Sequence, residues 1–297
     1  MSQTDFATED PGSVPPATVA KSPSELSEKS KWARGVRQRK LKSTLLVLGG
    51  QVVLVAIVLG FWEWLAVSGT VNPLFIGQPT KIFQQLLVQL ATPAIWVDAS
   101  STVGGWFFGW VLASIVAIVF AFIVTRSAHV RNIIEPITVA INGLPRVAFA
   151  PLFVLWFGIG LTSKIAMSFS IAFFVVFANT LAAVDGVDRD QALLAKVIGA
   201  TERQAFRKFI LPGAIPTIFA GLELAAIFAM LGTVAGELLA GSEGLGVKLA
   251  LYGSQFQTND YFATLTILGV LSLLITQILR AIRRRALHWQ TLDAAAR

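Results

Sequence analysis

The sequence predicts an all-α integral membrane protein with six transmembrane helices. Of its 297 residues, 55% are hydrophobic and only 14% are charged, whereas about a quarter of the residues in soluble domains are charged. Hydrophobic residues also gather in stretches of about 20, the length at which a helix crosses a bilayer. A soluble helical bundle would show a polar stripe at the 3.6-residue helical period, but Ser114 is the one polar residue of the stretch Val111–Val124.

Six stretches are long enough to cross the membrane. Four are free of charge, namely Ser43–Trp62, Ala99–Thr125, Ile165–Val184 and Tyr261–Leu279. Two are interrupted by charge, Pro136–Phe157 by Arg146 and Gly213–Leu238 by Glu223 and Glu237. We therefore expect a transmembrane domain over residues 43–285, between a disordered cytoplasmic tail that ends in a basic stretch (1–42) and a cytoplasmic C-terminal tail (286–297).

The positions of the basic residues predict the orientation of these spans. Of the 24 Lys and Arg residues, 20 lie in the two tails or in the loops that follow the second and the fourth span. The alternate loops hold only Lys81, Lys164 and Lys248. Because basic loops stay on the cytoplasmic side, both termini are expected in the cytoplasm. The basic patches are expected to meet anionic lipid headgroups rather than nucleic acid.

The chain lacks the residues that several kinds of site require. It has no cysteine and only two histidines, so thiolate chemistry and a multi-histidine metal site are not expected. The phosphate-binding pattern G-x-x-x-x-G-K-[ST] is absent, and no Gly-Lys dipeptide occurs. We therefore expect no catalytic residue, no metal and no cofactor on this chain, and no ATP hydrolysis by it.

Two shorter features predict how the spans are joined and packed. The stretch Lys81–Leu90 places its apolar residues on one helical face and predicts a short helix in the outer interface, with Thr80 as a weak cap. Glycines four residues apart allow helices to approach closely. Such pairs occur at Gly105/Gly109 and Gly232/Gly236.

The loop between the fourth and fifth spans has the pattern of a helix, a turn and a second helix. In the first helix, apolar residues recur at Leu193, Leu194, Val197 and Ile198. Gly199 then ends the helix, since glycine takes up a turn conformation at low steric cost. The apolar residues either bind a partner, as exposed apolar patches usually do, or pack against the chain's own spans.

Thr201 is expected to cap the second helix of this hairpin, which runs from Glu202 to Ile210. Two prolines, Pro212 and Pro216, mark where the fifth span begins. The hairpin is the one large cytoplasmic feature that the sequence predicts between the spans.

This hairpin resembles the motif that permease subunits of bacterial ABC importers carry before the penultimate core helix. The motif reads E-A-A-x-x-x-G and, after nine further residues, I-x-L-P. Matching positions are Ala195, Gly199, Leu211 and Pro212, while Leu193, Leu194 and Phe209 stand at the motif's glutamate, first alanine and isoleucine and depart from it.

Two further stretches narrow the resemblance. LPRVAFAPLFVLWFGIGLTSK (Leu144–Lys164) and GSEGLGVKLALYGSQFQTNDYFA (Gly241–Ala263) are similar to permeases of the aliphatic sulfonate, taurine, nitrate and bicarbonate type. The resemblance covers roughly residues 45–285 and not the N-terminal tail.

The resemblance implies a type I ABC importer permease with six spans and a cytoplasmic coupling-helix hairpin. Two permease copies, expected to be identical, would form the pore. ATPase subunits that use ATP and Mg would bind the hairpins, and a periplasmic or lipid-anchored solute-binding protein would deliver a small anionic or organic solute. The implied ATPase-coupling residues are Leu193, Leu194, Ala195, Gly199, Ala200, Arg203, Leu211 and Pro212. A secondary transporter driven by an ion gradient is the alternative.

Charged side chains inside spans are costly and are expected to face protein or water. Arg146 either attracts an anionic solute or pairs with Glu223 or with the carbonyls freed beside the preceding proline. Asn142 and Asn179 either hydrogen-bond between helices or line the translocation path together with Arg146 and Glu223. At the outer end of the fifth span, Glu237 either borders the docking site of the binding protein or belongs to a solvated outer edge.

Overall fold

The structure is a computed structural model that describes residues 46–187 and 197–287, where every regular element is helical. The expected tails, apart from residues 286 and 287, lie outside the described residues, as does the hairpin segment 188–196. By its internal contacts the chain divides into two units, residues 1–61 and 62–297. The described part of the first unit belongs to the helix Leu46–Val67, whose most apolar stretch contains no buried residue.

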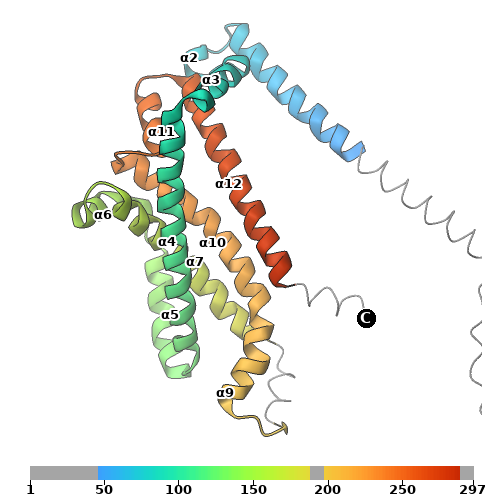
Figure 1. Ribbon diagram of the computed structural model, residues 1–297, viewed down its shortest axis with the longest axis vertical. Helices are drawn as coiled ribbons and strands as arrows, with labels where there is room; N and C mark the ends of the chain where they lie inside the picture. The colour runs from blue at the N-terminus through green and yellow to red at the C-terminus, as the bar shows by residue number, and fades with distance from the viewer. Residues whose placement is uncertain (1–45, 188–196, 288–297) are drawn as a thin grey trace, which may run out of the picture. The chain divides into compact units, whose positions relative to one another are not determined.

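The second unit is a helical bundle (Figure 1). Its elements are, in order, α2 (Pro73–Ile76), α3 (Pro79–Ala91), α4 (Pro93–Thr125), α5 (Ala128–Asn142), η1 (Arg146–Phe149), α6 (Ala150–Phe157), α7 (Leu161–Asp185), α9 (Glu202–Ala205), η2 (Phe206–Ile210), α10 (Leu211–Ala240), α11 (Leu245–Ser254) and α12 (Thr258–Ala286).

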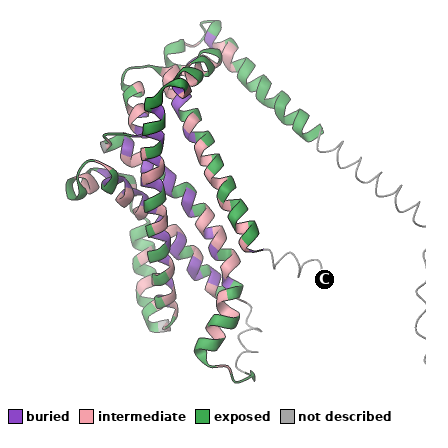
Figure 2. Cartoon of the chain, in the orientation of Figure 1, coloured by how far each residue is buried: buried purple, intermediate pink, exposed green. Residues whose placement is uncertain are grey.

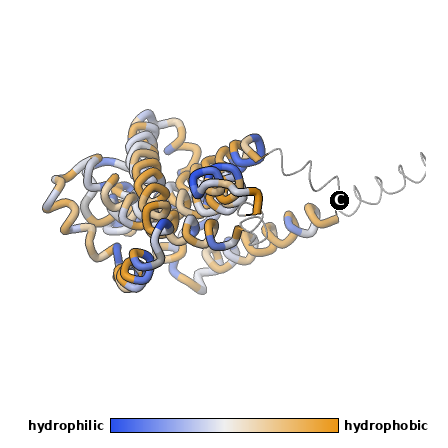
Figure 3. Tube along the Cα trace, turned by 90° about the horizontal axis from the view of Figure 1, so that it is seen from below, coloured by the Kyte–Doolittle hydropathy of each residue, from blue (hydrophilic) through white to orange (hydrophobic). Residues whose placement is uncertain are grey.

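Five helices of the described residues are long and apolar enough to cross a membrane: Leu46–Val67, α4, α7, Glu202–Leu239 and α12. A sixth is present if α5 and the bent segment after it count as one span. Figure 3 shows that hydrophobic residues dominate the trace and that hydrophilic residues occupy short stretches of it. The prediction of an all-helical membrane protein is therefore confirmed.

The third span is not the continuous helix Pro136–Phe157 that the sequence predicts. The helices His129–Asn142 and Arg146–Phe157 meet at an angle of 80°. Proline disfavours helical geometry at the residue before it, and Pro145 has the extended backbone angles φ −71° and ψ 91°. The single span therefore becomes α5, a 3-10 turn and the short helix α6.

Helix α7 packs between α4 and α10, and small residues make this close packing possible. A side-chain carbon on Gly109 would lie 2.4 Å from Cβ of Ser168, and one on Gly232 would lie 3.1 Å from the carbonyl oxygen of Met167. The expected close approach at the two glycine pairs is thus confirmed, and both pairs face α7.

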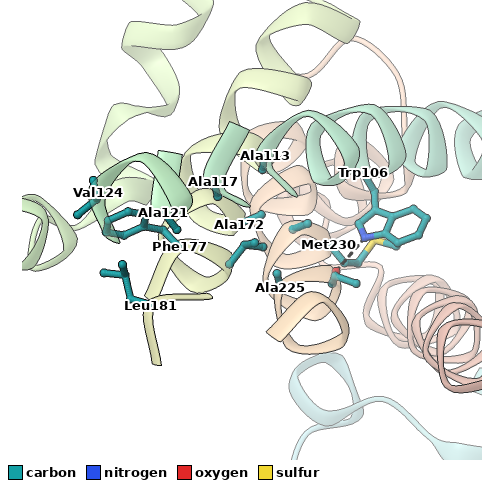
Figure 4. Close-up of a cluster of buried hydrophobic side chains, with 13 residues drawn as sticks. Trp106, Ala113, Ala117, Ala121, Val124, Ala172, Phe177, Leu181, Ala225 and Met230 are labelled. Carbon is teal, nitrogen blue, oxygen red and sulfur yellow. Dashed lines mark hydrogen bonds between the residues drawn. The ribbon is translucent and has the colours of Figure 1, made fainter. Parts of the chain in front are cut away.

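The largest buried cluster lies among these three helices (Figure 4). On α4 the buried positions Ala113, Ala117 and Ala121 are four residues apart and therefore share one face. Phe177 and Leu181 of α7 lie near one end of the cluster, and Trp106 lies near the other. Figure 2 shows the contrast with α5, along which no residue is coloured as buried.

The helix expected over Glu202–Ile210 is present as α9 and η2, and it continues without a break into the fifth span. Thr201 caps it as expected, with a reciprocal capping box to Gln204. The chain then makes one π-helical turn, in which the N–H of Leu211 bonds to the carbonyl of Phe206. This wider turn directly precedes Pro212, which has no N–H to donate to an α-helical turn.

Near the other end of the bundle, α3 confirms the short helix expected over Lys81–Leu90. Its first turn is satisfied by Glu63 rather than by Thr80 acting as cap, because the N–H of Thr80 donates to Glu63 Oε2 at 3.1 Å. Gln78 Nε2 also donates to Glu63 Oε1 at 2.6 Å. Helix α11 was not predicted, and it packs against α4, α10 and α12.

Candidate functional site

The bend in the third span places Arg146 beside two other elements. Arg146 is half-buried and begins the 3-10 turn that follows α5. Its Nη2 donates to Asn142 Oδ1 at 2.5 Å, and its Nη1 donates to the carbonyl oxygen of Ile171 at 3.4 Å. The guanidinium carbon also lies 4.1 Å from the centre of the Phe174 ring, within the range of a cation–π contact. One cation thus joins the end of α5 to the middle of α7.

The expected pair between Arg146 and Glu223 is not formed. Glu223 Oε2 instead accepts a hydrogen bond from Arg283 Nη1 of α12 at 3.4 Å, and Glu223 Oε1 is buried with no hydrogen-bond partner. Glu223 lines a mostly apolar cavity of about 390 Å³, whose other walls include Trp106, Trp110 and Ile278. Sequence reasoning missed Arg283 because 60 residues separate it from Glu223.

The four residues expected along the path do not converge. Asn142 and Arg146 are in contact. Asn179 hydrogen-bonds within its own helix, to the carbonyl of Val175 at 2.8 Å, and not between helices. Its Cβ fills the place that a side chain on Gly221 of α10 would take, at 2.5 Å. Asn179 therefore acts in the described structure as a packing residue between α7 and α10.

A cavity of about 230 Å³, with both charged and apolar lining residues, extends between α5 and α7. Asn142 and Phe174 line it, so it reaches the surroundings of Arg146. Its other lining residues are Arg131, Glu135, Thr138, Val139, Phe177, Ala178, Leu181, Ala182 and Asp185. Arg131 forms two parallel hydrogen bonds with Asp185, from Nη1 to Oδ1 at 2.5 Å and from Nη2 to Oδ2 at 2.6 Å. Of the four expected path residues, Asn142 lines this cavity, and Arg146 borders it through its contacts with Asn142 and Phe174.

The expected coupling residues are partly described. Leu193, Leu194 and Ala195 lie outside the described residues. Gly199 has a positive φ of 71°, as a helix-ending glycine does, and Ala200 is half-buried. Arg203 and Pro212 are exposed, and Leu211 is half-buried.

The apolar residues just before the turn are open to solvent. Val197 is 82% exposed and Ile198 is 62% exposed. For these two residues the structure therefore disfavours packing against the chain's own spans. The segment is nevertheless anchored beyond the turn, since the ring of Phe206 packs edge-on against Phe122 of α4 at 5.2 Å. An anchored segment with exposed apolar residues is suited to receive a partner.

At the other end of α10, Glu237 is only 1% exposed, so the expected solvated edge is wrong. Its Oε1 lies 3.0 Å from Nζ of Lys164, which is itself 2% exposed. Thr102 Oγ1 donates to Glu237 Oε2 at 2.9 Å, and so does the N–H of Gly246 at 2.9 Å. The two charges are therefore paired and hydrogen-bonded, as buried charges must be. We call these residues, with Asp98, the buried charge cluster.

The cluster also fixes the turn that leads into α11. The N–H of Gly244 donates to Asp98 Oδ1 at 2.9 Å, and Lys248 Nζ lies 3.7 Å from Asp98 Oδ2. Gly244 has φ 121°, and a side-chain carbon there would lie 2.1 Å from Glu237 Oε1. Sequence reasoning assigned Lys164 and Lys248 to loops. The glycines that follow Glu237 closely in the chain were the feature of the sequence that could have indicated this tight turn.

Comparison with known proteins agrees with this architecture. Residues 113–288, more than half of the chain, match the family described as binding-protein-dependent transport system inner membrane component. The chain is 32% identical over 240 residues to the taurine transport system permease protein TauC of Escherichia coli (strain K12), covering 79% of this chain and 87% of that one. It is 28% identical over 235 residues to the formylaminopyrimidine transport permease protein ThiX of Halalkalibacterium halodurans, covering 77% and 94%.

A third relative is a permease protein of Bacillus subtilis (strain 168) named for aliphatic sulfonates transport, 27% identical over 239 residues and covering 80% of this chain and 87% of that one. Among solved structures, the inward-facing MetNI methionine ABC transporter matches with a TM-score of 0.55 at 21% identity, over 68% of this chain and 97% of that one. This likeness shows the shared fold. The chain belongs to the binding-protein-dependent inner-membrane components, and it is a membrane-spanning permease subunit of an ABC importer.

Proposed function

We propose that this permease carries a small anion, of the sulfonate or taurine type, and that the solute passes along the cavity between α5 and α7. The observation that carries the proposal is Arg146, a half-buried cation whose nearest described partners are an amide, a carbonyl and an aromatic ring. Its charge is not neutralised by Glu223, which pairs with Arg283. A cation held in this way favours an anionic solute. The relatives named for taurine and aliphatic sulfonates support this substrate class.

The rest of the assembly follows from the family, whose members work with an ATPase and a solute-binding protein. We assign the ATPase contact to the segment Leu193–Pro212. Its described part begins with two exposed apolar residues, Val197 and Ile198, and continues into α10. Two identical copies of the chain would form the pore. Residues 1–42 and 286–297 would be cytoplasmic tails, and the end of the bundle that carries the buried charge cluster would face the binding protein.

Replacing Arg146 tests the substrate path. The chain is reconstituted in vesicles with its ATPase and binding protein, and ATP-driven uptake of labelled taurine and of a short alkanesulfonate is measured. We expect Arg146→Gln to lower uptake at least about tenfold, because a hydrogen bond to a charged group contributes about 1.5–3 kcal/mol. Arg146→Lys is expected to retain part of the activity, since it keeps the charge and loses the planar fork.

The matched control is Arg126→Gln, which removes an exposed arginine next to the end of α4. This variant is expected to transport normally. Normal uptake of both anions by Arg146→Gln would contradict the assigned path. Uptake that continues with an ion gradient and without the ATPase would contradict the importer function itself.

A further inference from the structure

The ion pair between Arg131 and Asp185 lies at the end of α7, just before the chain enters the expected hairpin. Asp185 is the last residue of α7, and the described chain continues only to Val187 before the segment 188–196. Arg131 is in the first turn of α5. The two side chains therefore connect the base of the hairpin directly to the start of the helix that leads to Arg146.

The geometry of this pair fixes the relative orientation of the two side chains as well as their separation. The two terminal guanidinium nitrogens, Nη1 and Nη2, donate to the two carboxylate oxygens at 2.5 and 2.6 Å. Such a two-pronged contact fixes the relative orientation of the two groups, which a single contact does not. Arg131 is further held by Glu135 of its own helix, whose Oε2 lies 3.2 Å from Nε. Arg131 is therefore held by Glu135 of its own helix and by Asp185 of α7.

Helix α5 packs lightly on the rest of the bundle, where the partly buried Ile134 packs against the core cluster and the helix also contacts α4. None of its described side chains is buried, whereas α4 and α7 share the alanine-rich core. At its far end, Asn142 accepts a hydrogen bond from Arg146, which also bonds to the carbonyl oxygen of Ile171 in α7. A helix with little buried surface shifts at lower cost than the core helices, so a pull on its polar contacts is expected to move it.

We propose that the Arg131–Asp185 pair is the link through which movement of the hairpin reaches α5 and, at the far end of α5, Arg146. This inference rests on the proposed function, because it assumes that an ATPase moves the hairpin. In it, Arg131 and Asp185 are positioning residues that act on the solute path through α5. ATP hydrolysis itself does not depend on the pair, whereas the amount of solute moved per ATP does.

The test compares charge removal with charge exchange in the full reconstituted complex. Asp185→Asn removes the ion pair with almost no change of shape. We expect the solute moved per ATP hydrolysed to fall at least about fivefold, the lower end of typical coupling between sites, with the ATPase rate without solute unchanged. The double exchange Arg131→Asp with Asp185→Arg is expected to restore the ratio to near that of the wild type. Arg126→Gln, which removes an exposed charge at the end of α4, is the control and is expected to leave the ratio unchanged.

A distance measurement covers the case in which the double exchange fails to assemble. Because the chain has no cysteine, spin labels attach only at the introduced Thr138→Cys in α5 and Glu202→Cys in α9. The distance between the two labels is then measured. In the wild-type background we expect their separation to change when ATP is trapped on the complex, and in Asp185→Asn we expect that change to be lost.

Two results would overturn the link. One is an unchanged ratio of solute to ATP in Asp185→Asn, and the other is a preserved distance change in that variant. A wild-type complex that takes up no solute with ATP would instead refute the proposed function, so the two failures are distinguishable.

Discussion

Glu237 and Lys164 illustrate at the residue scale what a charge requires inside a bundle. Each loses its hydration on burial, and the loss is offset only where opposite charge and hydrogen bonds surround it. Here Thr102 and the backbone N–H of Gly246 complete the shell of the carboxylate, while Ser101 Oγ accepts from Lys164 Nζ at 2.7 Å. The cluster joins α4, α7, α10 and the start of α11. Removing one partner would leave the other buried and unpaired.

The variant Glu237→Gln is therefore expected to destabilise the protein by about 3 kcal/mol, the lower end of what breaking a buried pair costs. The measurement is thermal or denaturant unfolding of the purified chain in detergent. Glu243→Gln is the matched control, because Glu243 is exposed and only its backbone carbonyl contacts Lys164. Equal stability of the two variants would show that the cluster does not hold the bundle together.

At Gly109 the packing depends on the absence of a side chain, because α7 leaves no room for one. A methyl group would lie 2.4 Å from Cβ of Ser168 and 2.9 Å from the carbonyl oxygen of Ile165. We expect Gly109→Ala to cost about 1–3 kcal/mol, as overpacking does. Gly104→Ala on the same helix meets its nearest atom, Leu161 Cδ1, only at 3.8 Å, and should be neutral or stabilising. Unfolding of both variants under the same conditions decides the point, and a stable Gly109→Ala would contradict it.

At the scale of elements, the sequence predicts spans well and their interruptions poorly. The stretches around α4, α7 and α12 were predictable because hydrophobic length depends on no other part of the chain. Pro145 carried the signal for the break of the third span, since proline restricts the residue before it. The pairs Glu223–Arg283 and Lys164–Glu237 were not predictable, because each joins residues more than 50 positions apart and depends on how the helices are rotated.

The same distinction holds within the candidate site. Arg146 and Asn142 are four residues apart, so their contact follows from local chain geometry once the helix ends between them. Asp185 gave no sign of its role, because a carboxylate at a helix end is ordinary and its partner Arg131 lies 54 residues away. The cavity between α5 and α7 thus combines one local contact with one that only the fold creates.

The whole molecule offers a direct test of its orientation, since it contains no cysteine. Single cysteines are introduced at Gln255, an exposed residue between α11 and α12, and at Glu202, an exposed residue of α9. A membrane-impermeant maleimide is expected to label Gln255→Cys in intact cells and Glu202→Cys only after the membrane is opened. The reverse pattern would invert the bundle and move the hairpin away from any cytoplasmic ATPase.

The helix that begins at Glu202 and ends at Leu239 is 38 residues long, or about 57 Å at 1.5 Å per residue. One wide turn and Pro216 lie in its first half, and nothing interrupts it from there to Glu237. Because nothing interrupts the helix from Pro216 to Glu237, a tilt of this part near Pro216 also shifts its end beside Lys164. Opening toward one side of the bilayer and sealing toward the other would then be a single mechanical event rather than two that need synchronising.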